Sequence, residues 1–444
     1  MPKNIGSEIT TPDTAGAAQS SGSREATADA MMAHFADRAA GFRPSAVRDV
    51  FEVAMQPGII SLAGGNPDLS LLPRTELADF AHTALVDLGD EILQYGSGAG
   101  YEPLAELICS FMRTEGAHPQ LADIQLTAGS QMGLDLVTKL FVNPGDVIIT
   151  EGPTYTGALG TFAGYQAQIQ HVAVDEHGMQ PELLEQAIEE LKALGHKVSF
   201  VYLIPNFQNP TGVTIPPERR KQLLEICRRH EVLVVEDNPY GLLGFSQQRT
   251  QSLYSLDPEN VIYLGSFSKI FSPGMRVGWM VAPAAVRKFL QIASEAVNIC
   301  PAMLSQRLTY EYMQAGMWEP HLERSAALYQ QRCAAVLAAL EKHMPTGTHW
   351  TKPTGGFFTW VTLPDSWEGN TAYLLAPAIE AGVVFVPGSA FYEGQVPTGM
   401  PAPAAPLGQR ELRIAYSGVA PEELSTGVQR LAQVVRAVST DNAT

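Results

Sequence analysis

Short apolar runs alternate with helix-forming segments along the middle of the chain, and this alternation limits the fold more than any other feature. From about residue 121, IQLTAG precedes QMGLDLVTKLF, VIITEGPTY follows, and KVSFVYLIPNFQNPTG precedes PPERRKQLLEICRRH. The runs VLVVEDNPY, VIYLGSFSK and VGWMVAP come next. Short β-branched runs between helices predict an α/β fold with a mostly parallel sheet covered on both faces.

The C-terminal part of the chain has a different pattern. After a helical region from about residue 303 to 343, FFTWVTL, VVFVPG and LRIAYS predict strands, with helices near 372–380 and 422–438. We therefore predict a large α/β domain at residues 76–330 and a smaller α+β domain at residues 331–444. A helical arm at residues 30–75 is expected to join the small domain. Residues 1–29 are rich in Ser, Thr, Ala and Gly, which predicts a disordered tail.

Charge and composition exclude several classes of protein. The formal net charge is −17 and no basic run occurs, so nucleic acid and membranes are poor candidate partners. The ten histidines show no HExxH or His-Cys spacing, and we predict no metal site. The first residues lack the apolar core of a signal peptide, so none is expected, and no apolar stretch reaches membrane-spanning length. Four scattered cysteines are typical of reduced thiols in a cytoplasmic protein.

One lysine stands in unusual surroundings. Lys269 lies among apolar residues in SFSKIFSPGMRVGW, which covers residues 266–279. A buried lysine costs desolvation energy unless its pKa falls or it is consumed chemically. Its neighbours Ser266, Ser268 and Arg276 are residue types that bind anions. The segment therefore predicts a lysine beside a negatively charged group.

Polar residues also follow three other predicted strands. In TAGSQMG, Ser130 and Gln131 open a helix after a glycine, which gives either an anion site or a simple helix cap. The asparagines of PNFQNPTG follow a strand directly, although a plain turn has the same composition. Asp237 and Tyr240 follow the apolar run VLVV. Because loops after parallel strands gather at one edge of the sheet, these groups are expected to meet there.

A further glycine-rich segment, YGSGAGY at residues 95–101, fails the test for a dinucleotide-binding loop. Tyr101 stands where the third glycine of GxGxxG is required. A dinucleotide cofactor is therefore not expected.

Taken together, four successive strand ends offer an anion cup, amide groups, a carboxylate with a phenol, and a lysine with serines and an arginine. This conjunction resembles the fold-type I pyridoxal 5′-phosphate (PLP) enzymes, specifically the class I/II aminotransferases. The resemblance covers about residues 30–437. It is carried by NPTG at residues 209–212, by the Asp237 and Tyr240 pair, and by SFSKxxxPGxRxGW around Lys269.

The resemblance implies a role for each residue around the cofactor. Lys269 would bond to the cofactor aldehyde and later act as the general base, and Asp237 would pair with the pyridine nitrogen. Asn209 and Tyr240 would hydrogen-bond the phenolic oxygen, and Tyr155 would stack on the ring unless it is a core aromatic. The groups that would hold the phosphate are Ser130, Gln131, Ser266, Ser268 and Arg276.

The resemblance also implies substrate and partner contacts. Arg413, in ELRIAYS, would grip the substrate α-carboxylate with its planar fork, the alternative being a surface arginine. Gly65, in GGNP, would bring backbone close to the substrate. Tyr95 would reach the phosphate in a neighbouring subunit, which implies a homodimer.

Within the family, PSAVRDV followed by PGIISLAGGNPD resembles the 2-aminoadipate and kynurenine aminotransferase group. In that group a mobile N-terminal helix covers the substrate, and Ser45 and Arg48 match its substrate-side positions. Arg48 would pair with an acidic side chain or swing aside for an apolar one. A solvated helix arginine is the open alternative.

The expected activity is ping-pong transfer of an amino group from an L-amino acid to a 2-oxo acid such as 2-oxoglutarate. The expected donors are aromatic or branched amino acids, or 2-aminoadipate. One alternative is a PLP-dependent lyase, since a shared fold does not fix the reaction. Another is an aminotransferase-like regulator, which needs an N-terminal DNA-binding module that the first 30 residues are not expected to contain.

Overall fold

The computed structural model describes residues 31–42, 50 and 52–441 of the 444-residue chain. The N-terminal segment predicted as a disordered tail lies outside these residues. Within the arm, residues 50 and 52–54 are helical, and the 3₁₀ helix η1 spans Asp37–Gly41.

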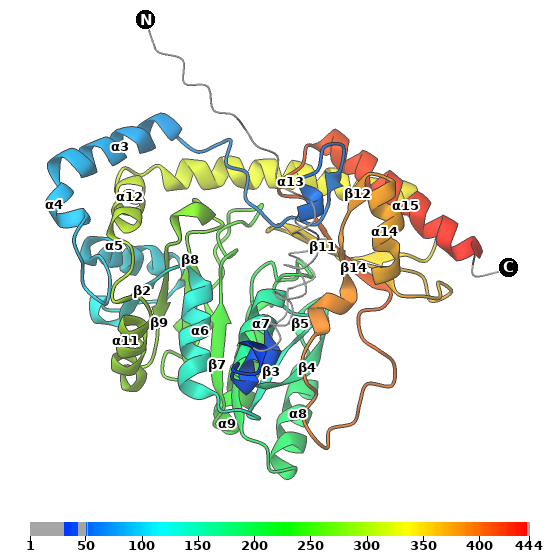
Figure 1. The fold of residues 1–444 in the computed structure, drawn as a ribbon, viewed down its shortest axis with the longest axis horizontal. Coiled ribbons are helices and arrows are strands. Elements are labelled where there is room, and N and C mark those ends of the chain that lie inside the picture. Colours follow the sequence, from blue (N-terminus) through cyan, green and yellow to red (C-terminus); the bar gives the residue numbers. More distant parts are fainter. Residues whose placement is uncertain (1–30, 43–49, 51, 442–444) are drawn as a thin grey trace, which may run out of the picture.

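An eight-stranded sheet forms the larger part of the molecule (Figure 1), with strands in the order β2-β9-β8-β7-β6-β3-β4-β5. The ladders are parallel except for those made by β9 and β5. Every residue of β3 and β8 is buried, as expected for strands packed on both faces. The strands are β2 (Ile124–Thr127), β3 (Val147–Gly152), β4 (Gln168–Asp175), β5 (Gly178–Met179), β6 (Val198–Leu203), β7 (Leu233–Asp237), β8 (Val261–Ser266) and β9 (Gly278–Val281).

Helices alternate with these strands and pack on the sheet, as the sequence pattern predicts. Helix α9 illustrates the local signals. Pro217 in its first turn has the backbone angle that a helix start requires, and the arginines of its last turn interact favourably with the helix dipole. The helices are α5 (Glu102–Met112), α6 (Ser130–Phe141), α7 (Thr156–Gly164), α8 (Pro181–Ala193), α9 (Pro217–Arg229), α10 (Leu253–Leu256), α11 (Ala284–Asn298) and α12 (Met303–Gln314). Short 3₁₀ turns are η2 (Arg113–Glu115), η3 (Leu121–Asp123) and η4 (Pro273–Met275).

A smaller antiparallel sheet, in the order β10-β11-β14-β13, forms the second lobe. Its strands are β10 (His349–Trp350), β11 (Phe358–Thr362), β13 (Val386–Pro387) and β14 (Glu411–Ala415). The helical elements of this lobe are η5 (Thr371–Leu374), α14 (Leu375–Glu380), η6 (Gly388–Tyr392) and α15 (Pro421–Asp441). The predicted fold class, a mostly parallel sheet between helices plus a smaller α+β part, is confirmed.

The N-terminal segment joins the small lobe through a short ladder. Strand β1 (Ile60–Ser61) pairs in parallel with β12 (Val383–Val384). After it, α3 (Arg74–Asp87) and α4 (Gly89–Ile92) extend along α12.

The long helical region expected at residues 303–343 is two helices rather than one. Helix α12 ends at Gln314, and α13 (Trp318–His343) begins after Gly316, whose φ of +67° favours glycine at the break. Helix α13 runs from the large lobe to the small one (Figure 1) and continues across residue 330. The predicted domain limits therefore stay a prediction.

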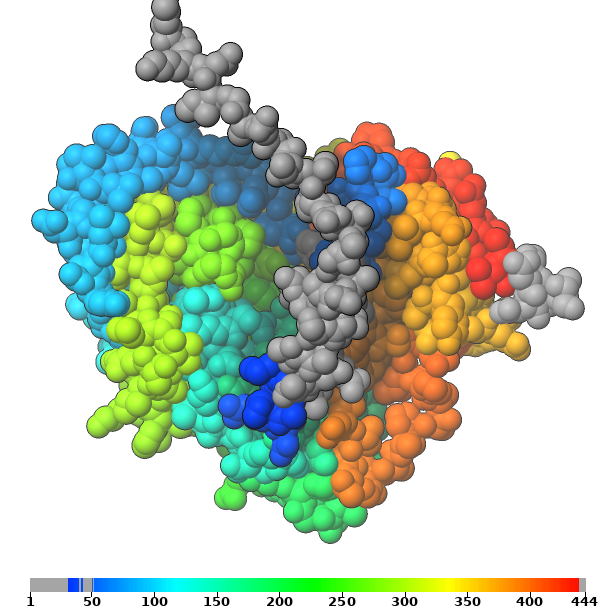
Figure 2. Space-filling view, in the orientation of Figure 1, coloured from blue at the N-terminus to red at the C-terminus, as the bar shows by residue number. Residues whose placement is uncertain are grey.

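Residues 393–409 form an exposed, largely irregular segment, as their Pro and Gly content predicts. This segment lies along the edge of the molecule in the orange part of Figure 2. Among the described residues, no helix combines the length and apolar character needed to cross a bilayer.

Gly265→Ala is expected to destabilise the protein, because β8 passes directly under a buried indole. A Cβ at Gly265 would lie 2.2 Å from the ring of Trp279, which is 1% exposed. Overpacking of this kind costs about 1–3 kcal/mol. The denaturant midpoint measures the effect.

Gly160→Ala is the matched control for this substitution. Gly160 is exposed on α7 with nothing within 4 Å of its added Cβ, so alanine should stabilise the helix by about 1 kcal/mol. A midpoint for Gly265→Ala at or above that of the parent protein would show that β8 and Trp279 are not tightly packed.

Candidate active site

A cavity of about 280 Å³ opens where the parallel strands end. It is lined from both lobes and from the loop at residues 64–68. Its lining combines three cationic groups, one carboxylate, amides, hydroxyls and aromatic rings, namely Gly65, Asn66, Ser130, Gln131, Tyr155, Ile204, Asn209, Asp237, Pro239, Tyr240, Ser266, Ser268, Lys269, Pro273, Arg276, Phe358 and Arg413.

Strand register brings the first half of this site together. Thr127 at the end of β2 lies opposite Gly278 of β9, and Gly278 lies opposite Ser266 at the end of β8. A Cβ on Gly278 would lie 2.7 Å from the backbone nitrogen of Ser130. Only a strand without a side chain at this point lets the first turn of α6 approach the end of β8 so closely.

Arg276 closes the cup that these strand ends form. Its Nη2 donates to the Ala128 carbonyl at 2.9 Å, and its Nη1 donates to Ser268 Oγ at 3.3 Å. The Ser266 hydroxyl donates to Ser268 Oγ at 2.9 Å. Gly129 has a φ of +81°, and a Cβ there would lie 2.5 Å from Arg276 Nη2. The result is a guanidinium, two hydroxyls and a helix N-terminus around one point, which is an arrangement suited to an anion.

Gln131 contributes differently from its neighbours. Its side-chain nitrogen donates to Thr161 Oγ1 at 2.7 Å and to the Gly157 carbonyl at 3.2 Å, both on α7. Its Oε1 accepts from the Tyr155 hydroxyl at 3.3 Å. The amide side chain is therefore engaged with α7 and Tyr155, so an anion bound here would meet the backbone N–H groups of the first turn of α6 instead.

Lys269 lies three residues beyond the end of β8, beside the loop at residues 64–68. Its Nζ donates to the Gly65 carbonyl at 3.0 Å. Burial lowers the pKa of Lys269 to about 8, and repulsion by Arg413 and Arg276 acts in the same direction. A substantial fraction of this amine is therefore neutral, and hence nucleophilic and basic, near physiological pH.

Asp237 is buried at the end of β7, with one oxygen held and the other unpaired. Its Oδ2 accepts from the Tyr202 hydroxyl at 2.7 Å, whereas its Oδ1 is buried without a hydrogen-bond partner among the described residues. Burial raises the pKa of Asp237 to about 6, against the lowering effects of the Tyr202 hydrogen bond and the charge of Lys269. An unpaired buried carboxylate oxygen is costly unless a ligand donates to it.

Tyr202 is a candidate functional residue that the sequence does not reveal. It is fully buried in β6, inside the apolar run VSFVYL, and nothing about a tyrosine in such a strand points to a site. The one available signal is its position three residues before Pro205, at the carboxyl end of a strand whose loop carries NPTG.

Arg413 extends from β14 into the cavity between the two lobes. Its Nη1 donates to Asn209 Oδ1 at 2.8 Å, and its Nη2 donates to the Ala63 carbonyl at 2.6 Å. The guanidinium carbon lies 4.4 Å from the centroid of the Phe358 ring, a cation–π contact. Burial lowers the pKa of Arg413 to about 10, so the group stays charged at neutral pH, and its Nε has no partner among the described residues.

Two tyrosines complete the cavity wall. Tyr240 is buried, and its ring lies against Phe357 and Phe358 with centroids 5.6 and 5.8 Å away. Burial raises the pKa of the Tyr240 phenol, which therefore stays protonated, and a hydrogen bond with Asn209 opposes this shift. Tyr155 is partly buried and precedes α7.

One predicted site residue among the described ones is not found at this cavity. Tyr95 is 72% exposed and is not among the lining residues. Ser45 and Arg48 lie outside the described residues. The other predicted residues surround one cavity, and their roles toward a cofactor and substrate stay predictions.

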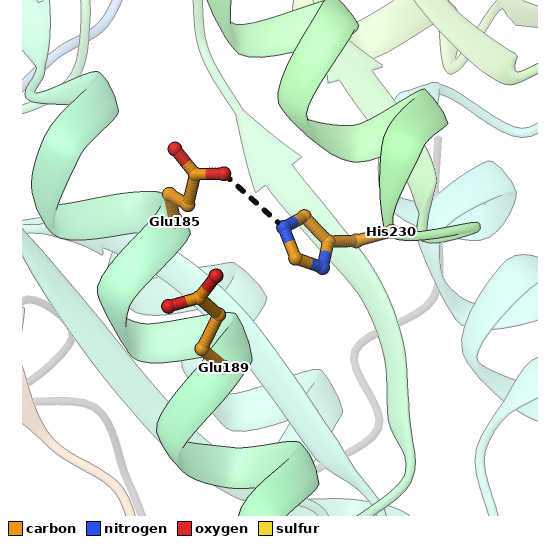
Figure 3. Close-up of side chains that lie close together, drawn as sticks. All are labelled: Glu185, Glu189 and His230. Carbon is orange, nitrogen blue, oxygen red and sulfur yellow. Dashed lines mark hydrogen bonds and ion pairs between the residues drawn. The ribbon is translucent and has the colours of Figure 1, made fainter.

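A separate group of potential metal ligands, none of which lines this cavity, lies between α8 and the end of α9 (Figure 3). Glu185 and Glu189 of α8 and His230 after α9 place their ligand atoms within 4.8 Å of one another. The Glu185 oxygen nearest the imidazole also pairs with Arg229 at 2.6 Å, so a cation there would compete with a guanidinium. We assign no metal to this group.

Known proteins with similar sequences are aminotransferases. The family model for class I and II aminotransferases matches residues 57–431. The aromatic-amino-acid aminotransferase 1 of Thermococcus litoralis is 37% identical over 406 residues, which is 91% of this chain and 94% of that protein. The 2-aminoadipate transaminase of Thermus thermophilus is 35% identical over 407 residues, which is 90% of this chain and 96% of that protein.

A solved structure agrees over nearly the whole length. The kynurenine aminotransferase of Pyrococcus horikoshii, crystallised in complex with PMP, superposes with a TM-score of 0.84 at 36% identity, covering 92% of this chain and 98% of that chain. The chain therefore belongs to the class I and II aminotransferases, the PLP-dependent transferases of nitrogenous groups with fold type I.

Proposed function

We propose that the protein transfers an amino group from an aromatic or branched L-amino acid, or from 2-aminoadipate, to a 2-oxo acid such as 2-oxoglutarate, in two half-reactions. The observation that carries the proposal is one cavity that holds a low-pKa lysine, a half-satisfied buried carboxylate and a buried arginine. The relatives named for aromatic amino acids and for 2-aminoadipate support the choice of donors.

The residues present fit pyridoxal 5′-phosphate at each of its functional groups. The anion cup of Ser266, Ser268, Arg276 and the first turn of α6 suits the phosphate. Asp237 offers its unpaired Oδ1 to the protonated ring nitrogen, and Asn209 with Tyr240 offers hydrogen bonds to the phenolic oxygen. When bound, this cofactor supplies an electron sink for the bond that breaks at the substrate Cα.

The protein's own groups supply binding and proton transfer. The Lys269 amine takes the proton from the substrate Cα and returns it at the position where product forms, a task suited to a pKa near neutrality. Arg413 holds the α-carboxylate through its guanidinium fork. Because Asn209 Oδ1 accepts from Arg413, the same amide links the cofactor end of the site to the substrate end.

The described walls of the cavity favour an apolar or aromatic substrate side chain. Phe358, Tyr155 and Ile204 line it, and its cationic groups are those already assigned to the cofactor and the α-carboxylate. An acidic side chain such as that of 2-aminoadipate therefore needs a charge from elsewhere. We propose Arg48 for this role, with Ser45 beside it.

We also propose that the enzyme is a cytoplasmic homodimer in which Tyr95 completes the partner's site. The segment that carries Tyr95 meets α11 where Gly98 packs against Glu295. Both carry exposed apolar side chains, which support an interface, namely Leu93 in the first and Phe289, Ile292, Val297 and Ile299 in or just after α11. The four cysteines all carry free thiols, as is usual in a reducing compartment.

Lys269→Ala is expected to lower transamination by at least about 10²–10⁴-fold, because the base that moves the Cα proton is lost. Formation of phenylpyruvate from phenylalanine and 2-oxoglutarate measures the effect. Lys342→Ala, an exposed position on α13, is the control and should keep parent activity. Full activity without Lys269 would exclude the proposed base, and ammonia release without a 2-oxo acid acceptor would point to a lyase.

Uptake of the cofactor by the apo protein should become faster as the pH rises through about 8. The neutral amine is the form that attacks the aldehyde, and the pKa of Lys269 is about 8 instead of its ordinary 10.5. Stopped-flow absorbance across pH 6–10.5, a range of about two units on either side, follows the reaction. Arg413→Gln removes a repelling charge and should move the midpoint upward, whereas a parent profile that rises only near the ordinary lysine pKa contradicts the assigned environment.

Tyr202→Phe is expected to weaken cofactor binding and lower kcat by about 10- to 100-fold, because a hydrogen bond to a charged group is lost beside the ring nitrogen. Fluorescence titration of apo protein with PLP and steady-state kinetics measure both effects. Tyr263→Phe is the control, since this buried tyrosine donates to Glu115 at 2.9 Å, away from the cavity lining. It should cost stability without either effect, and identical kinetics for the two variants would refute the assignment of Tyr202.

A further inference from the structure

The loop at residues 64–68 is tied to the middle of α13 by a partly buried ion pair and a hydrogen bond. Asp68 Oδ2 lies 2.6 Å from Arg332 Nη2, and the Asp68 backbone N–H donates to the Tyr329 hydroxyl oxygen at 2.9 Å. Tyr329 and Arg332 are 1% and 8% exposed and lie three residues apart, on one face of the helix. We call Asp68, Tyr329 and Arg332 the loop anchor.

The anchor holds a second segment as well. Arg332 Nη1 donates to the Ser417 carbonyl, just after the end of β14, and the Ser417 hydroxyl lies 3.4 Å from the Gly64 carbonyl. One guanidinium therefore joins the loop at residues 64–68 to the segment that follows Arg413. The Nε of Arg332 is buried without a partner among the described residues, so the guanidinium is held through its Nη1 and Nη2 contacts.

These two segments form the wall around Arg413. The Ala63 carbonyl accepts from Arg413 Nη2 at 2.6 Å, and the Ala415 N–H donates to the Leu62 carbonyl at 2.7 Å. Gly65 lines the cavity, where a Cβ would lie 2.5 Å from the Phe358 ring. Because contacts on both sides of Arg413 are this close, a shift of the loop moves the guanidinium fork that is to receive a carboxylate.

The position of the ion pair separates this role from general stabilisation of the fold. Asp68 belongs to neither sheet, and its carboxylate accepts from the Ser70 backbone N–H and pairs with Arg332. Exposed ion pairs add little to stability, and buried ones add little compared with apolar packing, whereas ion pairs fix one geometry over others in some proteins. Here the geometry that is fixed is that of the loop over the cavity.

We propose that Asp68, Tyr329 and Arg332 are positioning residues for the α-carboxylate site, acting through the loop at residues 64–68 and through Arg413. This inference rests on the proposed function in that it takes Arg413 as the carboxylate ligand. Donor and acceptor carboxylates use the same site in the two half-reactions. Loss of the anchor should therefore weaken both substrates by the same factor while the cofactor, held at the other end of the cavity, binds as before.

Asp68→Asn tests the proposal in the holoenzyme. Misplacement of a binding group by about 1 Å can cost up to about 10²-fold, and we expect KM for phenylalanine and for 2-oxoglutarate to rise together, on the order of tenfold. The fall in kcat/KM should come mainly from the higher KM, with kcat little changed. The affinity for PLP should stay at the parent value. Calorimetric Kd for 3-phenylpropionate, a carboxylate without an amino group, should rise by the same factor.

Two further variants make the result decisive. Tyr329→Phe removes a single hydroxyl and should give a smaller shift of the same kind, which decides the question if Asp68→Asn does not fold. Asp365→Asn removes the exposed ion pair with Arg410 on the same lobe and should leave all constants unchanged. An unchanged Kd for 3-phenylpropionate, or a rise in KM for only one substrate, overturns the anchor. If the parent protein binds 3-phenylpropionate but does not transaminate, the proposed function is wrong. The Kd values of parent and variants then still show whether the loop anchor positions the carboxylate site.

Discussion

The hydrogen-bond register of β2, β9 and β8 is the constraint on which the rest of the site depends. It sets Thr127, Gly278 and Ser266 in one row, so that the turn after β2 and the connection from β8 to β9 leave the sheet side by side. The parallel ladder of β7 with β8 then places Asp237 beside Leu264, two residues before the end of β8. The anion cup, the lysine and the carboxylate are thus fixed by backbone pairing, and their side chains need little adjustment to face one cavity.

The cavity carries an excess of positive charge, whereas the chain as a whole is negatively charged. A protein of net charge −17 gathers Lys269, Arg276 and Arg413 around a single carboxylate. Burial lowers the pKa values of Lys269 and Arg413, and repulsion by Arg413 and Arg276 lowers that of Lys269 further. An anion that enters the cavity offsets this repulsion. An excess of positive charge in a partly enclosed space selects phosphate and carboxylate groups over neutral ligands of similar size.

Much of this arrangement could be predicted from the sequence because the informative residues are local to strand ends. Each motif is recognisable from a few consecutive residues, namely SFSK, NPTG and the Asp237 and Tyr240 pair. The alternation of strands and helices predicts that they meet at one edge of the sheet. Tyr202 could not be predicted, because its partner lies 35 residues away and its own surroundings are purely apolar. The antiparallel direction of β9 and the break before α13 also escaped prediction, since they depend on tertiary pairing and on a single glycine conformation.

The ladder between β1 and β12 has a consequence for how the enzyme is made. Residues 60–61 pair with residues 383–384, so one strand of this ladder leaves the ribosome roughly 320 residues before its partner, tens of seconds earlier at typical synthesis speeds. The large sheet, from residue 124 to 281, is complete well before that moment. The loop that shapes the carboxylate site is therefore among the last parts to find its place, although it belongs to the first part to be synthesised.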